Sequence, residues 1–146
     1  MYVPLVFHPI LTDKLGRDAF KLFRQIVFRR RAKPLSEGLG HRRTAAGLAF
    51  LSGEMPFAAD GNIPEGITAQ THLTLERIAA TLATEGLSLA DVVSVNVFLT
   101  HKEDFAAFNA AYASHFSDPL PVRATVCTEL VAPARIEIAV VAALRG

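Results

Sequence analysis

Two charged residues near the C-terminal end interrupt segments that otherwise have the pattern of buried strands. Arg123 lies within residues 121–127 and Glu137 within residues 135–141. Burying an unpaired guanidinium costs several kcal/mol, so Arg123 needs a carboxylate from the protein or from a ligand. Arginine suits this role because its planar fork donates two parallel charge-assisted hydrogen bonds. The two residues predict a site for a small carboxylic acid; the alternative is a structural ion pair of Arg123 with Glu137 or Glu129.

Composition predicts one globular domain behind a basic segment. The chain has 146 residues and is 51% hydrophobic, enough for a single core. Residues 1–43 hold ten Lys/Arg and three Asp/Glu, a net charge of +7, whereas residues 44–146 hold five and eleven, a net charge of −6. We therefore predict a basic leader over residues 1–43, partly helical or irregular, and a single α+β domain over residues 44–146.

Several classes of protein are disfavoured by what the sequence lacks. The single cysteine excludes an internal disulfide and suits a reducing compartment. The five histidines show no metal-ligand spacing, so we expect no metal site. No apolar run reaches membrane-spanning length, and residues 1–7 do not resemble a signal peptide. These features predict a cytoplasmic protein with no membrane partner.

The leader contains one candidate interaction element. Residues 17–31 can form a basic amphipathic helix in which Phe20, Phe23 and Val27 share a face. Such a helix could contact a membrane surface or a nucleic acid, but a solvated or docked helix, or an irregular leader, is favoured because basic helices are common. Residues 32–46 predict a linker or an irregular strand.

A regular pattern of elements begins at Gly47. In order, it predicts a strand (48–52), a long loop (53–66), a helix (68–85), a strand (91–100), a helix (101–116) and two strands (122–130 and 135–144). Gly86 stands where a left-handed helix cap is expected. Right-handed crossovers place both helices on one face of a sheet, and the sheet is mixed because the last two strands run antiparallel through a turn. The predicted fold is a two-layer α+β domain.

Alternation along the strands predicts two different sheet faces. We expect a uniformly apolar set under the helices: Val93, Val95, Val97, Leu99, Val122, Ala124, Val126, Ile136, Ile138 and Val140. The opposite set is mixed: Ser94, Asn96, Phe98, Arg123, Thr125, Cys127, Glu137, Ala139 and Val141. This second face is too apolar for water and too polar for a monomer core. We therefore predict a homo-oligomer in which neighbouring subunits cover it.

Several stretches, in this order, resemble the reactive intermediate deaminase (Rid) family, also called YjgF-like or L-PSP endoribonuclease-like proteins. The resemblance begins near Gly47 and covers about two-thirds of the chain. The stretches are residues 50–56 (FLSGEMP), Gln70 with the helix around it, 92–99 (VVSVNVFL), 104–105, 109–112 (NAAY), 121–123 (PVR) and 136–138 (IEI).

The resemblance implies a bacillar chorismate-mutase-like fold and a homotrimer with sites between subunits. It also implies hydrolysis of reactive enamines and imines, such as 2-aminoacrylate, to a 2-oxo acid and ammonia without a cofactor. In that reaction Arg123 is expected to bind the carboxylate, and Glu137 to orient or activate water. The substrate-binding residues implied by the family are Ser52, Gly53 and Phe105, with Thr125 at a position where some members have a cysteine.

One departure from the family keeps other functions open. Family members carry a pocket-closing tyrosine in a Gly-Pro-Tyr-Ser-like segment, whereas residues 38–43 here are GLGHRR. The alternatives are an endoribonuclease-like translation inhibitor and a non-catalytic trimer that binds a small carboxylate or a protein. RNA cleavage would need a basic groove and an acid–base pair. Because residues 44–146 are net acidic, a nucleic acid ranks below a small carboxylic acid as the partner.

Overall fold

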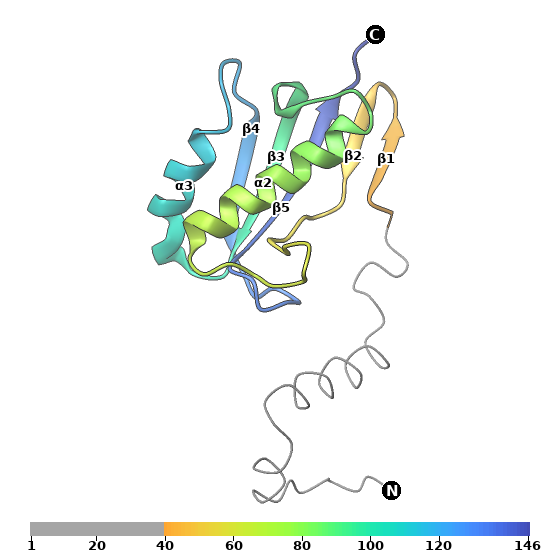
Figure 1. Ribbon diagram of the computed structural model, residues 1–146. Helices are drawn as coiled ribbons and strands as arrows, with labels where there is room; N and C mark the ends of the chain where they lie inside the picture. The colour runs from red at the N-terminus through yellow and green to blue at the C-terminus, as the bar shows by residue number, and fades with distance from the viewer. Residues whose placement is uncertain (1–39) are drawn as a thin grey trace, which may run out of the picture. The chain divides into compact units, whose positions relative to one another are not determined.

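A computed structural model describes residues 40–146 of the chain (Figure 1). The predicted helix over residues 17–31 lies outside the described residues. The elements of the described part are β1 (Arg42–Ala45), β2 (Leu48–Leu51), α2 (Ile67–Ala83), η2 (Leu89–Asp91), β3 (Val92–Leu99), η3 (Lys102–Asp104), α3 (Phe105–Ala113), β4 (Val122–Cys127) and β5 (Ile136–Ala143). η2 and η3 are single 3-10 turns.

The sheet is mixed, as predicted, and has the strand order β1-β2-β5-β3-β4. β3 and β4 are parallel and the other neighbours are antiparallel. Both helices cover one face, which confirms the α+β two-layer prediction (Figure 1). The last two strands run in opposite directions but are not neighbours, because β3 lies between them. The crossover through α3 brings β4 to one edge of β3, and β5 takes the other edge.

A tight hairpin joins β1 to β2 and sets the first edge of the sheet. Ala46 and Gly47 both have positive φ, 51° and 77°, as the two central residues of a type I′ hairpin turn do. β1 begins at Arg42 and pairs with Leu51 there, so the sheet includes two residues on the leader side of the predicted boundary at residue 43.

The longer helix, α2, supplies most of the helical side of the core. Leu75, Ile78 and Leu82 are fully buried against the sheet, in agreement with the predicted apolar face. Gly86 has φ 69°, the left-handed cap predicted for it, and the backbone N–H of Leu87 closes the end of the helix on the carbonyl of Leu82.

The predicted faces are correct for β5 but wrong in part for β3 and for the whole of β4. Val93 is 43% exposed because a register irregularity between Val92 and Ser94 turns Val92 inward instead. β4 pairs with β3 so that Arg123 is beside Val95 and Thr125 beside Val97. In-register neighbours on parallel strands face the same side, so Arg123, Thr125 and Cys127 lie on the helix side of the sheet. Their neighbours Val122, Ala124 and Val126, predicted to be under the helices, are exposed on the open face.

Candidate functional site

Arg123 lies beneath α3 on an aromatic platform. Its Cζ atom is 4.5 Å from the ring centroid of Tyr112 and 5.2 Å from that of Phe108. Its Nη2 donates a hydrogen bond to Oδ1 of Asn109, at 2.8 Å. Phe108, Asn109 and Tyr112 all belong to α3. They can surround one side chain because residues one, three or four positions apart lie close together on the surface of a helix. A cation over aromatic rings keeps its charge available, since the rings attract the guanidinium without neutralising it.

The predicted alternative, a structural ion pair of Arg123 with Glu137 or Glu129, does not form within residues 40–146. Four other arginines of this part pair with carboxylates, namely Arg42 with Glu85, Arg77 with Glu54, Arg135 with Asp104 and Arg145 with Asp91. Among the described residues, Asn109 is the one acceptor for the Arg123 guanidinium. Most of its N–H groups are therefore available to a carboxylate from outside the protomer.

An open hollow adjoins Arg123. α3 contributes Asn109, Tyr112 and Ala113 to its lining, and the segment from Phe116 to Pro121 contributes the other wall. Within the described part of the chain, two buried hydroxyls nearby, Tyr112 Oη and Thr125 Oγ1, have no hydrogen-bond partner. Burial raises the pKa of Tyr112, while the charge of Arg123 opposes that effect. The lining of the hollow thus includes the Arg123 guanidinium and the residue Tyr112, whereas Thr125 lies outside that lining.

Glu137 lies on the opposite, open face of the sheet, in close contact with Gly53. A Cβ atom at position 53 would be 2.8 Å from Glu137 Cδ and closer still to Oε1. Only a glycine leaves room for the carboxylate here. Burial raises the pKa of Glu137 above its usual value. A carboxyl group with a raised pKa is better able to accept a proton and release it again.

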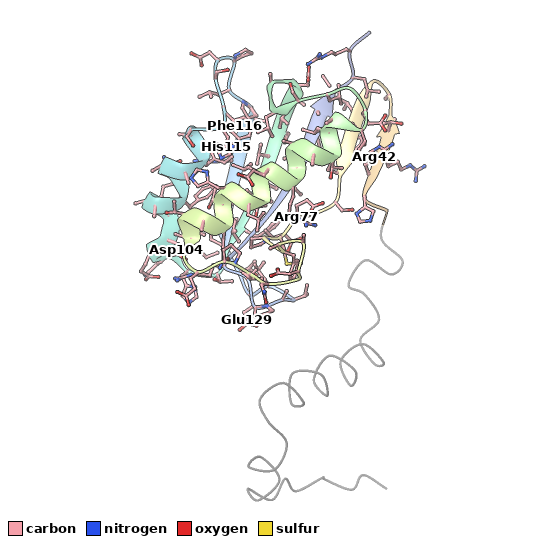
Figure 2. All side chains as sticks on the ribbon, in the orientation of Figure 1. Arg42, Arg77, Asp104, His115, Phe116 and Glu129 are labelled. Carbon is pink, nitrogen blue, oxygen red and sulfur yellow. The ribbon has the colours of Figure 1, made fainter. Side chains whose placement is uncertain are left out.

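Backbone hydrogen bonds hold the segment that contains Ser52 and Gly53 beside Glu137. Glu54 and Ile138 exchange two backbone hydrogen bonds, of 2.8 and 2.9 Å. The Glu54 side chain also accepts a bond, at 3.0 Å, from Nε of Arg77, the residue of α2 that Figure 2 labels. The Ser52 hydroxyl donates to the carbonyl oxygen of Gly40. Gly40, which belongs to the stretch that lacks the family's tyrosine, therefore lies against Ser52.

The structure does not bring Arg123 and Glu137 together within one protomer, which corrects the predicted shared face. Arg123 pairs with Val95, and Val95 pairs in turn with Val140 of β5. Glu137 is three residues from Val140 and on the other side of the sheet. Two groups separated by a sheet layer cannot hold one small acid between them. Of the predicted residues, Ser52 and Gly53 gather near Glu137, and Thr125 shares the helix side with Arg123.

Phe105 adjoins the aromatic platform of Arg123 through Phe108 but does not line the hollow beside Arg123. It is the first residue of α3, is 46% exposed, and its ring lies 6.2 Å from that of Phe108. Asp104, which Figure 2 labels near the start of α3, accepts two hydrogen bonds from Arg135, at 2.8 and 3.0 Å, and this bidentate pair fixes the start of the helix. An exposed aromatic on a fixed helix end is free to contact another subunit.

Sequence reasoning missed the residues that support Arg123. Asn109 and Tyr112 belong to the NAAY stretch that carried the family resemblance, but no role was assigned to them. A signal was available, because Asn109 interrupts the otherwise apolar or small residues of α3, as Arg123 interrupts its strand. Matching these two interruptions requires knowing that α3 lies over β4.

Other kinds of site find no support in residues 40–146. No three His, Cys, Asp or Glu side chains of this part gather to hold a metal ion. None of its helices combines the length and apolar composition needed to cross a bilayer.

The fold and these residues define a known class of protein. The family model described as Endoribonuclease L-PSP matches residues 32–144. RidA from a Psychrobacter species has a similar structure, with a TM-score of 0.69 and 31% identity over 73% of this chain and 90% of that one. The chain therefore belongs to the L-PSP endoribonuclease family, also called Rid or YjgF-like, as the sequence resemblance indicated.

Two further relatives are similar to this chain. E. coli TdcF, solved with bound serine, has a TM-score of 0.68 and 29% identity over 72% of this chain and 87% of that one. The Schizosaccharomyces pombe protein named mmf2, mitochondrial, is 46% identical over 83 residues. That match covers 56% of this chain and 65% of mmf2, so the chain spans just under two thirds of that relative's length.

Proposed function

We propose that this protein is an enamine/imine deaminase that hydrolyses reactive 2-enamino and 2-imino acids to 2-oxo acids and ammonia. The observation that carries the proposal is the state of Arg123, which is held by Asn109 and two aromatic rings while no described carboxylate neutralises it. A cation kept in this way is suited to an anionic ligand. The serine bound to TdcF is itself a small carboxylic acid, which supports this class of ligand.

In the proposed reaction Arg123 orients the substrate through its carboxylate. The enamine tautomerises to the imine, water adds to the imine carbon, and the C–N bond breaks to release ammonia. Glu137 acts as the proton acceptor for the attacking water and returns that proton to the leaving nitrogen, a role that its raised pKa favours. The reaction also proceeds slowly in free water, so positioning and proton transfer are sufficient to accelerate it.

The separation of Arg123 from Glu137 supports a site made by two copies of the chain. β4 is an edge strand, and its open face exposes Val122 (71%) and Val126 (51%). A neighbouring protomer that packs along this edge strand, beside both of its faces, could present its own Glu137 near Arg123. We therefore propose a homotrimer with sites between subunits. Light scattering at micromolar concentration should give about three times the 15.8 kDa protomer mass; a monomer mass would contradict the shared site.

The decisive experiment supplies freshly generated 2-aminoacrylate and follows pyruvate release above the spontaneous rate. We expect clear acceleration by the native protein. Arg123→Lys keeps the charge but loses the bidentate geometry, and should lower kcat/KM by about tenfold or more. Arg145→Lys is the matched control, because Arg145 pairs with Asp91 at an exposed position. Full activity of Arg123→Lys would refute the assigned role.

Two other functions are distinguished by the same protein samples. The family description names an endoribonuclease, so RNA cleavage is tested directly, with Arg123→Ala as the control and with increasing salt. A non-catalytic binding trimer is the second alternative, favoured by the absence of tyrosine from residues 38–43. It predicts binding of pyruvate to Arg123 without any acceleration of 2-aminoacrylate hydrolysis.

We propose a cytoplasmic location. The mitochondrial name of mmf2 makes the mitochondrion the competing compartment, since residues 1–43 are rich in arginine and poor in acidic residues. Fluorescent fusions of the full chain and of residues 44–146 distinguish the two locations. Diffuse signal from both fusions supports the cytoplasm, whereas organellar signal that requires residues 1–43 supports the mitochondrion.

A further inference from the structure

Two histidines from different elements form a direct hydrogen bond at one end of α3. Nδ1 of His72, on α2, lies 2.7 Å from Nε2 of His115, two residues beyond the last residue of α3. The ring centroids are 5.0 Å apart and the planes are tilted by 45°. Both side chains are half-buried. Figure 2 shows His115 and Phe116 at the end of α3 opposite Asp104.

A continuous series of contacts connects this pair to Arg123. His115 precedes Phe116, whose ring stacks on that of Tyr112 with centroids 4.5 Å apart. The Tyr112 ring in turn lies 4.5 Å from the Arg123 guanidinium carbon. The backbone N–H of His115 also bonds to the carbonyl of Tyr112, at 3.0 Å. A movement of His115 would therefore shift the platform on which Arg123 rests.

We infer that His72 and His115 form an acid-sensitive latch, which holds the end of α3 against α2 at neutral pH and loosens the Arg123 platform when it opens. The hydrogen bond needs one N–H and one lone pair. A first proton added to the pair leaves both present. A second proton places hydrogens on both facing nitrogens and positive charge on both rings, so the bond is lost. The relevant proton is thus the second one taken up by the coupled pair.

Two neighbouring ionisable side chains, His72 and Glu76, affect the pKa of His115 in opposite directions. The pKa of His115 is lowered from 6.5 mainly by burial and also by His72, while Glu76, on the same helix as His72, acts to raise it. Asp118 and Arg123 line the neighbouring hollow. Because the folded chain binds this proton more weakly than the unfolded chain, the contribution of His115 to stability is fully present above pH 6.5 and declines as the pH falls below it.

The test reads the position of the platform and does not depend on catalysis, so it is independent of the proposed deaminase activity. The chain has two tyrosines, Tyr2 and Tyr112, so ring-labelled full-length protein gives two tyrosine signals, assigned with Tyr2→Phe. NMR then follows the Tyr112 ring and the histidine rings between pH 7.5 and 5. We expect the Tyr112 signal to move with the second protonation step of the pair, at a midpoint below about pH 6.5.

Two variants separate the latch from a general effect of acid. His72→Gln can donate to neutral His115 or accept from charged His115, so the Tyr112 signal should stay at its neutral-pH position throughout. His72→Leu cannot bond in either state, so the signal should have its acid position already at pH 7.5. His101→Gln is the control, because His101 bonds to the adjacent Thr100 and should leave the step unchanged. A Tyr112 signal that ignores the histidine titration, or a step that persists in His72→Gln, would overturn the inference.

Discussion

The carboxylate of Glu137 occupies the space that any side chain at Gly53 would need. A Cβ atom at Gly53 would lie 2.8 Å from Glu137 Cδ and 3.0 Å from its Cγ. The two residues belong to segments more than eighty positions apart, which are joined by the backbone pairing of Glu54 with Ile138. The absence of a side chain at Gly53 therefore leaves the space in which the proposed catalytic carboxylate lies.

Gly53→Ala should reduce activity much more than stability. The added methyl group meets the flexible end of Glu137, which can turn away, so the carboxylate is displaced while the sheet remains intact. We expect kcat for 2-aminoacrylate to fall by about tenfold or more, with the thermal midpoint lowered by less than about 4 °C. Gly40→Ala is the matched control, since its Cβ would meet nothing closer than 3.8 Å. Unchanged kcat in Gly53→Ala would show that the carboxylate position is unimportant.

Asn109→Asp should weaken substrate binding through charge. The variant places a carboxylate 2.8 Å from Arg123 Nη2, where the native amide oxygen accepts its hydrogen bond. The guanidinium would then have an internal partner that competes with the substrate, and a half-exposed ion pair of about 1 kcal/mol corresponds to about a fivefold rise in KM. Steady-state kinetics measure this directly. Ala110→Asp adds the same charge at an exposed position of α3 and should leave KM unchanged.

Glu137→Gln should stabilise the fold at neutral pH and not in acid. Burial raises the pKa of Glu137 above 4.5, so the folded chain binds this proton more tightly than the unfolded chain does. The ionised form is therefore the less stable one, and its cost appears as the pH rises through the folded pKa. Thermal unfolding of the variant and the native protein at pH 4 and pH 7 should show a relative gain at pH 7 only. Glu103→Gln, at an exposed position, serves as the control; equal gains at both pH values would contradict the prediction.

Tyr112→Phe should be neutral or stabilising. The Tyr112 hydroxyl is buried and has no partner within residues 40–146, so its removal sacrifices no hydrogen bond of the described structure. We expect the free energy of unfolding to be unchanged or to rise by about 1 kcal/mol in chemical denaturation. Tyr112→Leu removes the ring beneath Arg123 and should cost about 2 kcal/mol or more. A marked loss in Tyr112→Phe would mean that the hydroxyl gains a partner in the assembled protein.

Most elements of the domain were predictable because their signals are local. The apolar spacing of Leu75, Ile78 and Leu82 predicted the buried face of α2, and Gly86 predicted its end. Arg123 and Glu137 could be singled out as charges on apolar strands without any structure. Both features depend on neighbours in the sequence, which is why a pattern of residues is enough to find them.

Only the tertiary structure decided which side chains of β4 point toward the helices. Alternation divides this strand into two sets but does not say which set faces the helices, since Val122, Ala124 and Val126 are as apolar as a buried face requires. Because Arg123 pairs with Val95, the set that contains Arg123 faces α3, and the apolar set is exposed at the edge of the sheet. A parallel register joins strands through a long crossover and leaves no local mark in the sequence, and a shift of one residue reverses every side chain. The sequence thus determined which residues carry charge and where the elements lie, whereas the three-dimensional pairing decided that Arg123 and Glu137 point to opposite sides of the sheet.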